Sequence, residues 1–318
     1  MKIVFFGTPE FAVASLENLI KHKYDVVAVV TSPDKPAGRG LQMQCSAVKT
    51  YCLAQGLTVL QPNNLKDESF VAALKKLNAD LHIVVAFRML PEQIWNMPPM
   101  GTYNLHASLL PKYRGAAPIN WCIINGDKES GVTTFKLQHQ IDTGNILMSE
   151  KVALNDNMNA GDLHDLLMHT GANLLLRTVQ LIEQSLHNKS ELHFISQKEN
   201  EVSHAPKLFK EHCKIDWSKT TQQIHNLIRG LSPFPGAVCN LNNGDNKPKQ
   251  FKILSSKIVH SNESGTNGTL ITDNQQYMHV CCADGVLELN EIQMEGKKRM
   301  NVEAFLRGYK LADCAKLE

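Results

Sequence analysis

An amide and an imidazole at the end of one apolar stretch are the first side chains in this sequence whose spacing could serve chemistry. Asn104 and His106 are two residues apart, and the period of a β-strand puts both on one face. An imidazole can move protons near neutral pH, and a neutral amide can donate to a developing oxyanion. By itself the pair fits a hydrogen-bonded, partly buried histidine as well as it fits an active site.

A carboxylate further along the chain could complete such a site. Asp142 belongs to the segment QIDTGNI, and Asp142-Thr143-Gly144 is typical of a turn. A carboxylate can orient a histidine and stabilise its imidazolium. The turn alone also explains Asp142, because spacing in the sequence does not show that it meets His106.

The elements that would position these residues alternate between short apolar runs and amphipathic stretches. The expected strands are 3–6, 26–30, 57–60, 81–86 and 103–105, and the expected helices are 11–20, 47–54 and 70–77. Continuous β-branched runs separated by helices predict a parallel sheet covered on both faces, in a doubly wound α/β domain. Ligands of such sheets bind beyond the carboxyl ends of the strands, where Asn104 and His106 fall.

The second half of the chain has another pattern. A long helix is expected over 160–186, a polar linker after it, and a helix near 220–229. Short alternating strands are then expected at 237–241, 251–259, 269–271, 277–281 and 286–292. They predict a small β-barrel or sandwich. We therefore expect a first domain over 1–187, a linker over 188–207 and a second domain over 208–318.

Composition narrows the class of protein. The chain has 318 residues, is 43% hydrophobic and carries a formal net charge of +2, which argues against disorder. Its scattered cysteines form no C-x-x-C pair, and His164 and His169 do not align on a helix, so we expect no metal. The apolar runs fall short of the roughly 18 residues that span a bilayer, and the N-terminus does not resemble a signal peptide. We expect a cytoplasmic protein without a membrane contact.

Two loops carry further information. FFGTPEF, after the first expected strand, has one glycine where a dinucleotide-binding fold has G-x-G-x-x-G, which argues against a nicotinamide enzyme. SPDKPAGRGLQ, residues 32–42, combines prolines, glycines and two basic residues. Lys35 and Arg39 could hold a phosphate-bearing partner there, or the segment could be a solvated connection.

Over essentially its whole length, the sequence resembles the methionyl-tRNA formyltransferase family. NLHASLLPKYRGAAPI and IDTGNI resemble the folate-dependent formyltransferases generally. IVFFGTPEFA, SPDKPAGRG, HAPKLFKEHCKIDW and GKKRMNVEAFLRG resemble the tRNA enzymes more narrowly. The resemblance implies a Rossmann-like catalytic domain and a C-terminal OB-like β-barrel. It implies 10-formyltetrahydrofolate as the formyl donor and initiator methionyl-tRNA as the acceptor.

The resemblance also assigns residues. The implied catalytic trio is Asn104, His106 and Asp142. Folate contacts are implied for Phe87, Arg88, Met89, Leu90, Ser108, Leu109, Leu110, Pro111 and Asp142. tRNA contacts are implied for Lys35, Arg39, Lys207, Lys297, Lys298 and Arg299. We expect the enzyme to act as a monomer.

One segment departs from the family pattern. The family usually has A-[YF]-G-x-I-L-P before the proline at position 91, and this chain has Ala86-Phe87-Arg88-Met89-Leu90-Pro91. It is one residue shorter and has arginine where glycine is common. The sequence therefore does not determine the shape of the pocket near Arg88 that the resemblance implies for the pterin ring of the folate.

Three other interpretations remain. A formyltransferase for a small amine, such as a glycinamide nucleotide or an amino sugar, would share the HASLLP and DTG motifs. A nicotinamide oxidoreductase is disfavoured by the missing glycines. A non-catalytic RNA-binding protein would leave Asn104, His106 and Asp142 unexplained. Incubation with 10-formyltetrahydrofolate and different acceptors would separate all of these.

Overall fold

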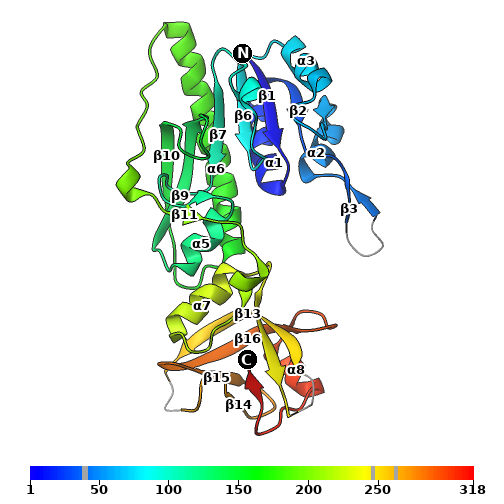
Figure 1. Ribbon diagram of the computed structural model, residues 1–318, viewed down its shortest axis with the longest axis vertical. Helices are drawn as coiled ribbons and strands as arrows, with labels where there is room; N and C mark the ends of the chain where they lie inside the picture. Colours follow the sequence, from blue (N-terminus) through cyan, green and yellow to red (C-terminus); the bar gives the residue numbers. More distant parts are fainter. Residues whose placement is uncertain (38–41, 245–247, 261–263) are drawn as a thin grey trace. The chain divides into compact units, whose positions relative to one another are not determined.

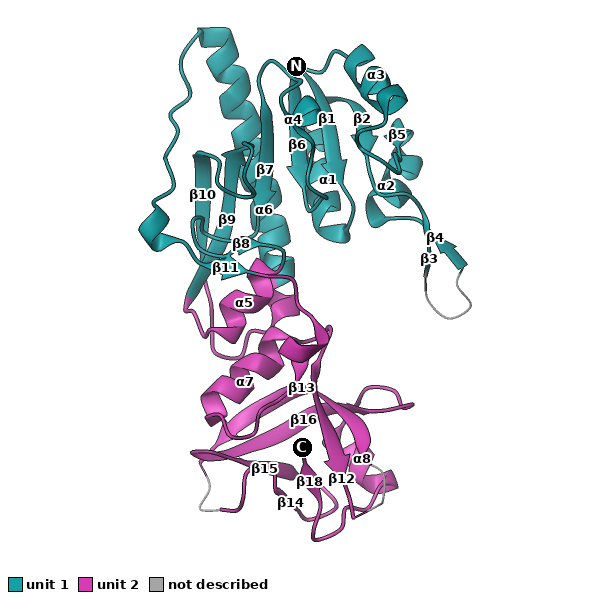
Figure 2. Ribbon diagram, viewed as in Figure 1, with its two compact units in different colours: residues 1–116, 129–152, 164–205 teal, residues 117–128, 153–163, 206–318 magenta. Residues whose placement is uncertain are grey.

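The computed structural model describes residues 1–37, 42–244, 248–260 and 264–318 (Figure 1). They form two compact units, coloured separately in Figure 2. Unit 1 contains residues 1–116, 129–152 and 164–205, and unit 2 contains residues 117–128, 153–163 and 206–318. The units interleave along the chain, and most of the expected linker packs within unit 1. The division expected from the sequence, with a first domain that ends at residue 187 and a second that begins at residue 208, stays a prediction.

Unit 1 is built on a seven-stranded sheet with the order β10-β9-β7-β6-β1-β2-β5. The strands are β1 (Lys2–Gly7), β2 (Asp25–Val30), β5 (Val59–Leu60), β6 (Leu81–Val85), β7 (Thr102–His106), β9 (Glu129–Lys136) and β10 (Ile146–Ala153). The five strands from β5 to β7 pair in parallel, and β9 is antiparallel to β7. The last two strands were not expected from the sequence.

Helices cover both faces of this sheet. They are α1 (Glu10–Lys21), α2 (Ala47–Gln55), α3 (Glu68–Lys76), α4 (Glu92–Trp95) and α6 (Ala160–Asn188), whose residues from 164 on belong to unit 1. On one face α1 and α6 lie together, since the Asn18 side chain donates to the Ala172 carbonyl at 3.1 Å. On the other, α3 and α4 pack against Val4 and Phe6. Alternate residues of β1 therefore point into two cores.

Local signals explain where the helices begin. The Ser46 hydroxyl accepts the Lys49 N–H at 3.0 Å at the start of α2. The Asp67 carboxylate accepts the Phe70 N–H at 3.1 Å at the start of α3. Each side chain satisfies one of the backbone donors that a helix leaves open at its N-terminus.

Short elements complete unit 1. β3 (Lys35–Ala37) and β4 (Gln42–Gln44) pair antiparallel, and β8 (Arg114–Gly115) pairs in parallel with β11 (His204–Ala205). A 3-10 turn, η1 (Glu199–Glu201), precedes β11. The segment expected to be a linker therefore contains paired structure.

Unit 2 is an antiparallel sheet that curls toward closure. Its strands are β12 (Ala237–Asn242), β13 (Lys249–Val259), β14 (Leu270–Thr272), β15 (Met278–Cys282), β16 (Gly285–Met294), β17 (Met300–Asn301) and β18 (Lys316–Leu317). The order is β14-β15-β16-β13-β12-β18, with β17 beside β16. Its two ends meet, because the Leu317 N–H donates to the Gly268 carbonyl at 2.8 Å and Thr269 bridges Lys316.

Helices α5 (Pro118–Ile124), α7 (Thr221–Gly230) and α8 (Val302–Gly308) and the turn η2 (Lys210–Cys213) accompany this barrel. A capping box between Thr220 and Gln223 begins α7. Phe251 and Phe305 belong to the barrel core, where their rings pack edge to face with centroids 5.6 Å apart. The predicted fold class, a Rossmann-like α/β domain and a barrel-like β domain, is confirmed. In the described residues, no helix is both long and apolar enough to cross a membrane.

Candidate active site

The strand β7 carries Asn104 and His106 to the carboxyl end of the parallel part of the sheet. Asn104 lies between Val84 of β6 and Phe135 of β9, and His106 is the last residue of the strand, opposite Thr133. The side chain of His106 is 7% exposed. The position agrees with the rule that such sheets bind ligands beyond their carboxyl ends.

Hydrogen bonding defines the proton positions of His106. Its Nε2 lies 2.8 Å from the carbonyl oxygen of Tyr113. A carbonyl only accepts, so Nε2 carries a proton and the neutral ring presents Nδ1 as an acceptor. A second proton on Nδ1 would give the imidazolium without breaking the bond to Tyr113. His106 can therefore exchange a proton through Nδ1 while Nε2 holds the ring in place.

Asp142 faces that free nitrogen. Its Oδ2 lies 3.9 Å from Nδ1 of His106, and its side chain is 12% exposed. The same oxygen accepts the Gly115 N–H at 2.9 Å. The structure thus brings together a histidine and a carboxylate that are far apart in the sequence. Their separation is longer than a hydrogen bond and leaves the imidazolium within reach of a compensating charge.

The turn around Asp142 has an unusual backbone. Asp142 has φ of 54°, in the left-handed region that a side chain other than glycine seldom adopts. Two residues on, a Cβ atom on Gly144 would lie 1.8 Å from the Lys136 carbonyl oxygen, so only glycine fits. The Asp-Thr-Gly motif therefore has a steric explanation as well as a chemical one.

The loop after β7 is fixed by its own hydrogen bonds and by β9. The Ser108 hydroxyl donates to the Lys112 carbonyl at 2.6 Å. Thr133 donates its hydroxyl to the Ser108 carbonyl at 2.7 Å and accepts the Leu110 N–H at 3.2 Å. Of the four residues expected to contact folate here, Ser108, Leu110 and Pro111 are buried and Leu109 is half-buried. Whether they contact folate stays a prediction.

The segment from Phe87 to Leu90 divides by exposure. Leu90 is buried in the core and Phe87 packs against it, whereas Met89 is 67% exposed. Arg88 donates to the carbonyl oxygens of Pro62 and Asn63, the latter at 2.9 Å. The arginine that replaces the common glycine is thus tied to the loop after β5.

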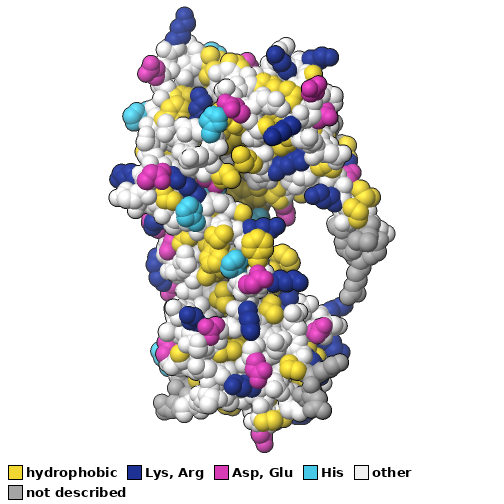
Figure 3. Space-filling model, viewed as in Figure 1, with side chains coloured by type: hydrophobic (Ala, Val, Ile, Leu, Met, Phe, Trp, Pro, Cys, Tyr) yellow, Lys and Arg dark blue, Asp and Glu magenta, His cyan; other side chains and the backbone are white. Residues whose placement is uncertain are grey.

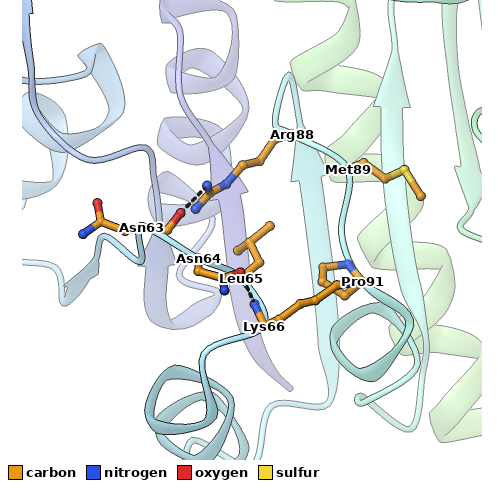
Figure 4. A pocket seen from close by; sticks show the side chains of 7 residues that line it. All are labelled: Asn63, Asn64, Leu65, Lys66, Arg88, Met89 and Pro91. Carbon is orange, nitrogen blue, oxygen red and sulfur yellow. Dashed lines mark hydrogen bonds between the residues drawn. The ribbon is translucent and has the colours of Figure 1, made fainter.

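A pocket of about 300 Å³ opens beside this arginine (Figure 4). It is lined by Asn63, Asn64, Leu65, Lys66, Arg88, Met89 and Pro91. In Figure 4 the Arg88 side chain reaches toward Asn63, while Met89 points in another direction. Arg88 and Met89 therefore face different surroundings, and the expected folate contacts at these two positions remain predictions.

The basic residues expected to contact tRNA are spread over both units. Lys35 is exposed on β3, and Arg39 lies outside the described residues. In unit 2, Lys207 lies over the Phe209 ring, with Nζ 5.9 Å from the centroid. Lys297, Lys298 and Arg299 are exposed and consecutive between β16 and β17. On the face drawn in Figure 3, basic and acidic side chains are interspersed over both units.

Arg299 differs from its two lysine neighbours. Its Nε donates to Oε1 of Glu291 at 2.7 Å, and a second contact joins its terminal nitrogen to Oε2. The side-chain hydrogen bond to Arg299 lowers the pKa of Glu291, and the reciprocal bond raises the pKa of Arg299. This arginine is already partnered by a carboxylate.

Sequence reasoning missed the groups that hold the site. The Tyr113 carbonyl and the Gly115 N–H are backbone groups, which carry no residue signal. Gln197 donates to the backbone around Asp142 and lies in the polar stretch interpreted as a linker. Arg114, in the segment YRGAAP, is buried and contacts Gln197, but the sequence alone does not indicate this contact. Among the described residues, no group of three or more His, Cys, Asp or Glu side chains is placed to hold a metal ion.

Comparison with known proteins identifies the family of the chain. The sequence model described as Formyl transferase matches residues 1–179, and the one described as Formyl transferase, C-terminal domain, matches residues 207–310. A protein of Flavobacterium johnsoniae named Methionyl-tRNA formyltransferase is 50% identical over 317 residues, covering 100% of this chain and 99% of its own.

The chain belongs to the methionyl-tRNA formyltransferase family. A second methionyl-tRNA formyltransferase, from Bacteroides thetaiotaomicron, is 47% identical over 321 residues and covers 100% of this chain and 98% of its own. The predicted family resemblance is confirmed.

Solved structures share the fold of this methionyl-tRNA formyltransferase family member. WlaRD, a sugar 3N-formyl transferase solved in the presence of dTDP and 5-N-formyl-THF, has a TM-score of 0.65 and 22% identity, covering 94% of this chain and 99% of WlaRD. HypX from Aquifex aeolicus, in complex with tetrahydrofolic acid, has a TM-score of 0.64 and 16% identity over 97% of this chain. The match takes in 47% of HypX, so this chain spans about half its length.

Proposed function

We propose that this chain transfers the formyl group of 10-formyltetrahydrofolate to the α-amino group of methionyl initiator tRNA. The observation that carries the proposal is the approach of Asp142 to His106 at the end of β7. It occurs in a chain that matches two methionyl-tRNA formyltransferases from end to end. In this proposal the enzyme serves translation initiation and acts in the cytoplasm as a monomer.

The reaction forms one C–N bond and breaks another. The unprotonated amine attacks the formyl carbon and gives a tetrahedral intermediate that carries an oxyanion. The bond from this carbon to the folate nitrogen then breaks, and the proton released by the amine passes to that nitrogen. The products are formyl-methionyl-tRNA and tetrahydrofolate. The balance requires no oxidant, no reductant and no covalent bond to the enzyme.

Asn104 and His106 would stabilise the oxyanion. The Asn104 amide offers N–H donors, and the protonated His106 offers Nδ1–H while Nε2–H stays on the Tyr113 carbonyl. Removing one donor to an oxyanion typically lowers kcat by about 10²–10³. Asp142 would stabilise the imidazolium and, through water, help the proton to reach the leaving nitrogen.

The folate would lie beside this trio. We assign its contacts to two stretches at the carboxyl end of the sheet, 87–90 and 108–111, together with Asp142. The burial of Leu90 and Leu110 fits a role in supporting the pocket wall. The exposure of Met89 fits direct contact with the ligand. Among structural relatives, HypX was solved with tetrahydrofolic acid, and WlaRD in the presence of 5-N-formyl-THF.

The tRNA would be held mainly through its phosphates. Lys35 and Arg39 would contact the acceptor end, and Lys207 and residues 297–299 would add contacts from unit 2. Such binding weakens as salt concentration rises, because bound phosphates release counterions. Substitution Arg39→Ala should raise the KM for methionyl-tRNA. Unchanged kinetics at low and moderate salt would remove the loop from the proposal.

A choice of acceptors tests the proposed function. The protein is incubated with 10-formyltetrahydrofolate and, separately, with methionyl initiator tRNA, uncharged initiator tRNA or a dTDP-linked amino sugar. Formylation detected by mass spectrometry only with the charged tRNA supports the proposal. Faster formylation of the amino sugar would assign the chain to small-amine formyl transfer instead.

A further inference from the structure

We propose that Gln197 is a positioning residue that holds Asp142 beside His106. The inference rests on the proposed function of this site and adds a residue from the segment 188–205. Gln197 itself does not touch the reacting atoms. It acts on the backbone of the Asp142 turn.

Gln197 clamps two carbonyl groups of that turn. Its Nε2 lies 2.8 Å from the carbonyl oxygen of Asp142 and 2.8 Å from that of Gly144. A side-chain amide has two N–H bonds, so one can point at each carbonyl. The first of these carbonyls belongs to Asp142 itself, the residue with the left-handed conformation. Such a conformation costs on the order of 1–3 kcal/mol and persists where the surroundings over-determine it.

Arg114 determines which end of the amide faces the turn. The Nε of Arg114 donates to Oε1 of Gln197 at 3.0 Å. A guanidinium has no acceptor, so the oxygen of the amide must face Arg114 and the nitrogen must face Asp142. The Arg114 side chain is 8% exposed, and another of its nitrogens lies 3.1 Å from Oε1 of Glu199. The orientation of Gln197 is therefore fixed by a buried charge.

The same segment also holds the side chain of Asp142. The Gly115 N–H that binds its carboxylate belongs to β8, which pairs with β11. The Arg114 N–H donates to the Ser203 carbonyl at 2.9 Å, and the Ala116 N–H donates to the Ala205 carbonyl at 2.8 Å. Gly115 has φ of 128°, and a Cβ there would lie 2.6 Å from the Ala205 carbonyl oxygen. Residues 197–205 thus fix Asp142 through its backbone and through its carboxylate.

Loss of the Gln197 hydrogen bonds should lower the rate of the reaction rather than weaken the binding of substrate. A displacement of about 1 Å in a catalytic group can cost about 10² in rate. Without Gln197, the carbonyls of Asp142 and Gly144 lose these two hydrogen bonds, and the turn could relax toward an ordinary backbone conformation. The distance between Asp142 and His106 would then no longer be fixed.

The informative variant is Gln197→Glu. Glutamate has a similar shape and still accepts from Arg114, but its carboxylate cannot donate to the Asp142 and Gly144 carbonyls. We expect kcat to fall about 10- to 100-fold, with the KM for methionyl-tRNA and the thermal midpoint little changed. The matched control is Gln184→Glu on α6, an exposed glutamine that should leave kcat unchanged. If Gln197→Glu is unstable, Gln197→Met removes the same donors without adding a charge.

Two further readouts separate positioning from general structural support. In an Asp142→Asn background, Gln197→Glu should lower kcat by less than about threefold, because the two residues act as one unit. In ¹⁵N-histidine NMR spectra, Gln197→Glu should shift the His106 ring signals, identified by their loss in His106→Ala, and Gln184→Glu should not.

The outcomes are distinct. Wild-type kcat in a folded Gln197→Glu variant, or full additivity with Asp142→Asn, would overturn the positioning role. If the wild-type protein does not formylate methionyl-tRNA, the proposed function fails instead. The His106 NMR signals then still decide whether Gln197 controls the surroundings of His106: a shift supports the clamp and unchanged signals overturn it.

Discussion

The Nδ1 atom of His106 lies 3.9 Å from the Oδ2 atom of Asp142. The two residues come from the end of a buried strand and from a strained turn. Because Nε2 is bound to the Tyr113 carbonyl, Nδ1 is the nitrogen that can accept a proton. The carboxylate is placed to stabilise the cation so formed. This pairing gives the first prediction.

The substitution Asp142→Asn removes the negative charge of this side chain and keeps nearly the same shape. Asparagine tolerates the left-handed conformation and can still accept the Gly115 N–H, so the stability of the fold should stay near that of wild type. The missing charge should lower kcat by at least about 10², as for other histidine–carboxylate pairs. Asp142→Ala should lose a similar rate and also about 1–2 kcal/mol of stability. Stopped-flow formylation and urea unfolding measure the two effects, and a kcat of Asp142→Asn within fivefold of wild type would remove the charge from the mechanism.

His82 should make the fold sensitive to acid. It lies on β6, is 1% exposed, and its Nδ1 has no partner among the described residues. Burial lowers the pKa of His82 from 6.5 to about 4. Between these values the unfolded chain binds a proton that the folded chain does not, so stability is full above pH 6.5 and is lost as pH falls toward 4. At pH 5 this linkage amounts to about 2 kcal/mol.

The variant His82→Phe keeps a ring beside Phe6 and removes the titration. Its free energy of unfolding should therefore fall by about 2 kcal/mol less than that of wild type between pH 7.5 and pH 5. Urea unfolding at the two pH values provides the measurement. His169→Gln, which alters an exposed residue of α6, is the control and should follow wild type. A pH dependence unchanged in His82→Phe would show that His82 titrates normally or that other groups dominate.

Arg88→Gly restores the residue common in the family. We expect the free energy of unfolding to fall by about 1 kcal/mol, because the carbonyls of Pro62 and Asn63 exchange a guanidinium for water. The KM for 10-formyltetrahydrofolate should change less than threefold, since the guanidinium faces the loop after β5. Steady-state kinetics and urea unfolding check both expectations. A tenfold change in that KM would place Arg88 in contact with the donor.

Lys297 and Lys298 should contribute to tRNA binding more than Arg299, which Glu291 already neutralises. The double variant Lys297→Gln with Lys298→Gln should reduce the slope of log K against log salt by roughly 1.4, about 0.7 for each phosphate that is no longer neutralised. Filter binding of initiator tRNA over a range of salt concentrations measures the slope. Lys75→Gln with Lys76→Gln on α3 is the matched control. Equal slopes in the two double variants would exclude the 297–299 turn from the interface.

The sequence predicted the parallel core of the fold well because hydrophobic periodicity is a local signal. The expected strand Ile3–Phe6 lies within β1, and the helix expected over 47–54 coincides with most of α2. The strands β9 and β10 were missed. β9 is buried along nearly its whole length but includes Ser130, Thr133 and Thr134, so its pattern is not a continuous apolar run.

The side chains of the candidate site could be proposed from the sequence, whereas the groups that hold them in place could not. Asn104 and His106 share a strand, so their common face follows from local geometry. The approach of Asp142 depends on long-range pairing, which one sequence does not reveal. The role of Gln197 could not be predicted, because one glutamine in a polar stretch has no distinguishing pattern. The bonds that fix it exist only after the chain has folded.

The most direct test of formyl transfer through His106 is single-turnover formylation by wild type and His106→Ala, with each protein in excess over methionyl initiator tRNA and with saturating 10-formyltetrahydrofolate. Acid-urea gels separate the formylated from the unformylated aminoacyl-tRNA, and filter binding measures the affinity for tRNA. We predict rapid formylation by wild type, a rate at least about 10² lower in His106→Ala, and nearly equal tRNA affinity. Equal formylation rates in the two proteins, or no formylation by wild type, would contradict this mechanism.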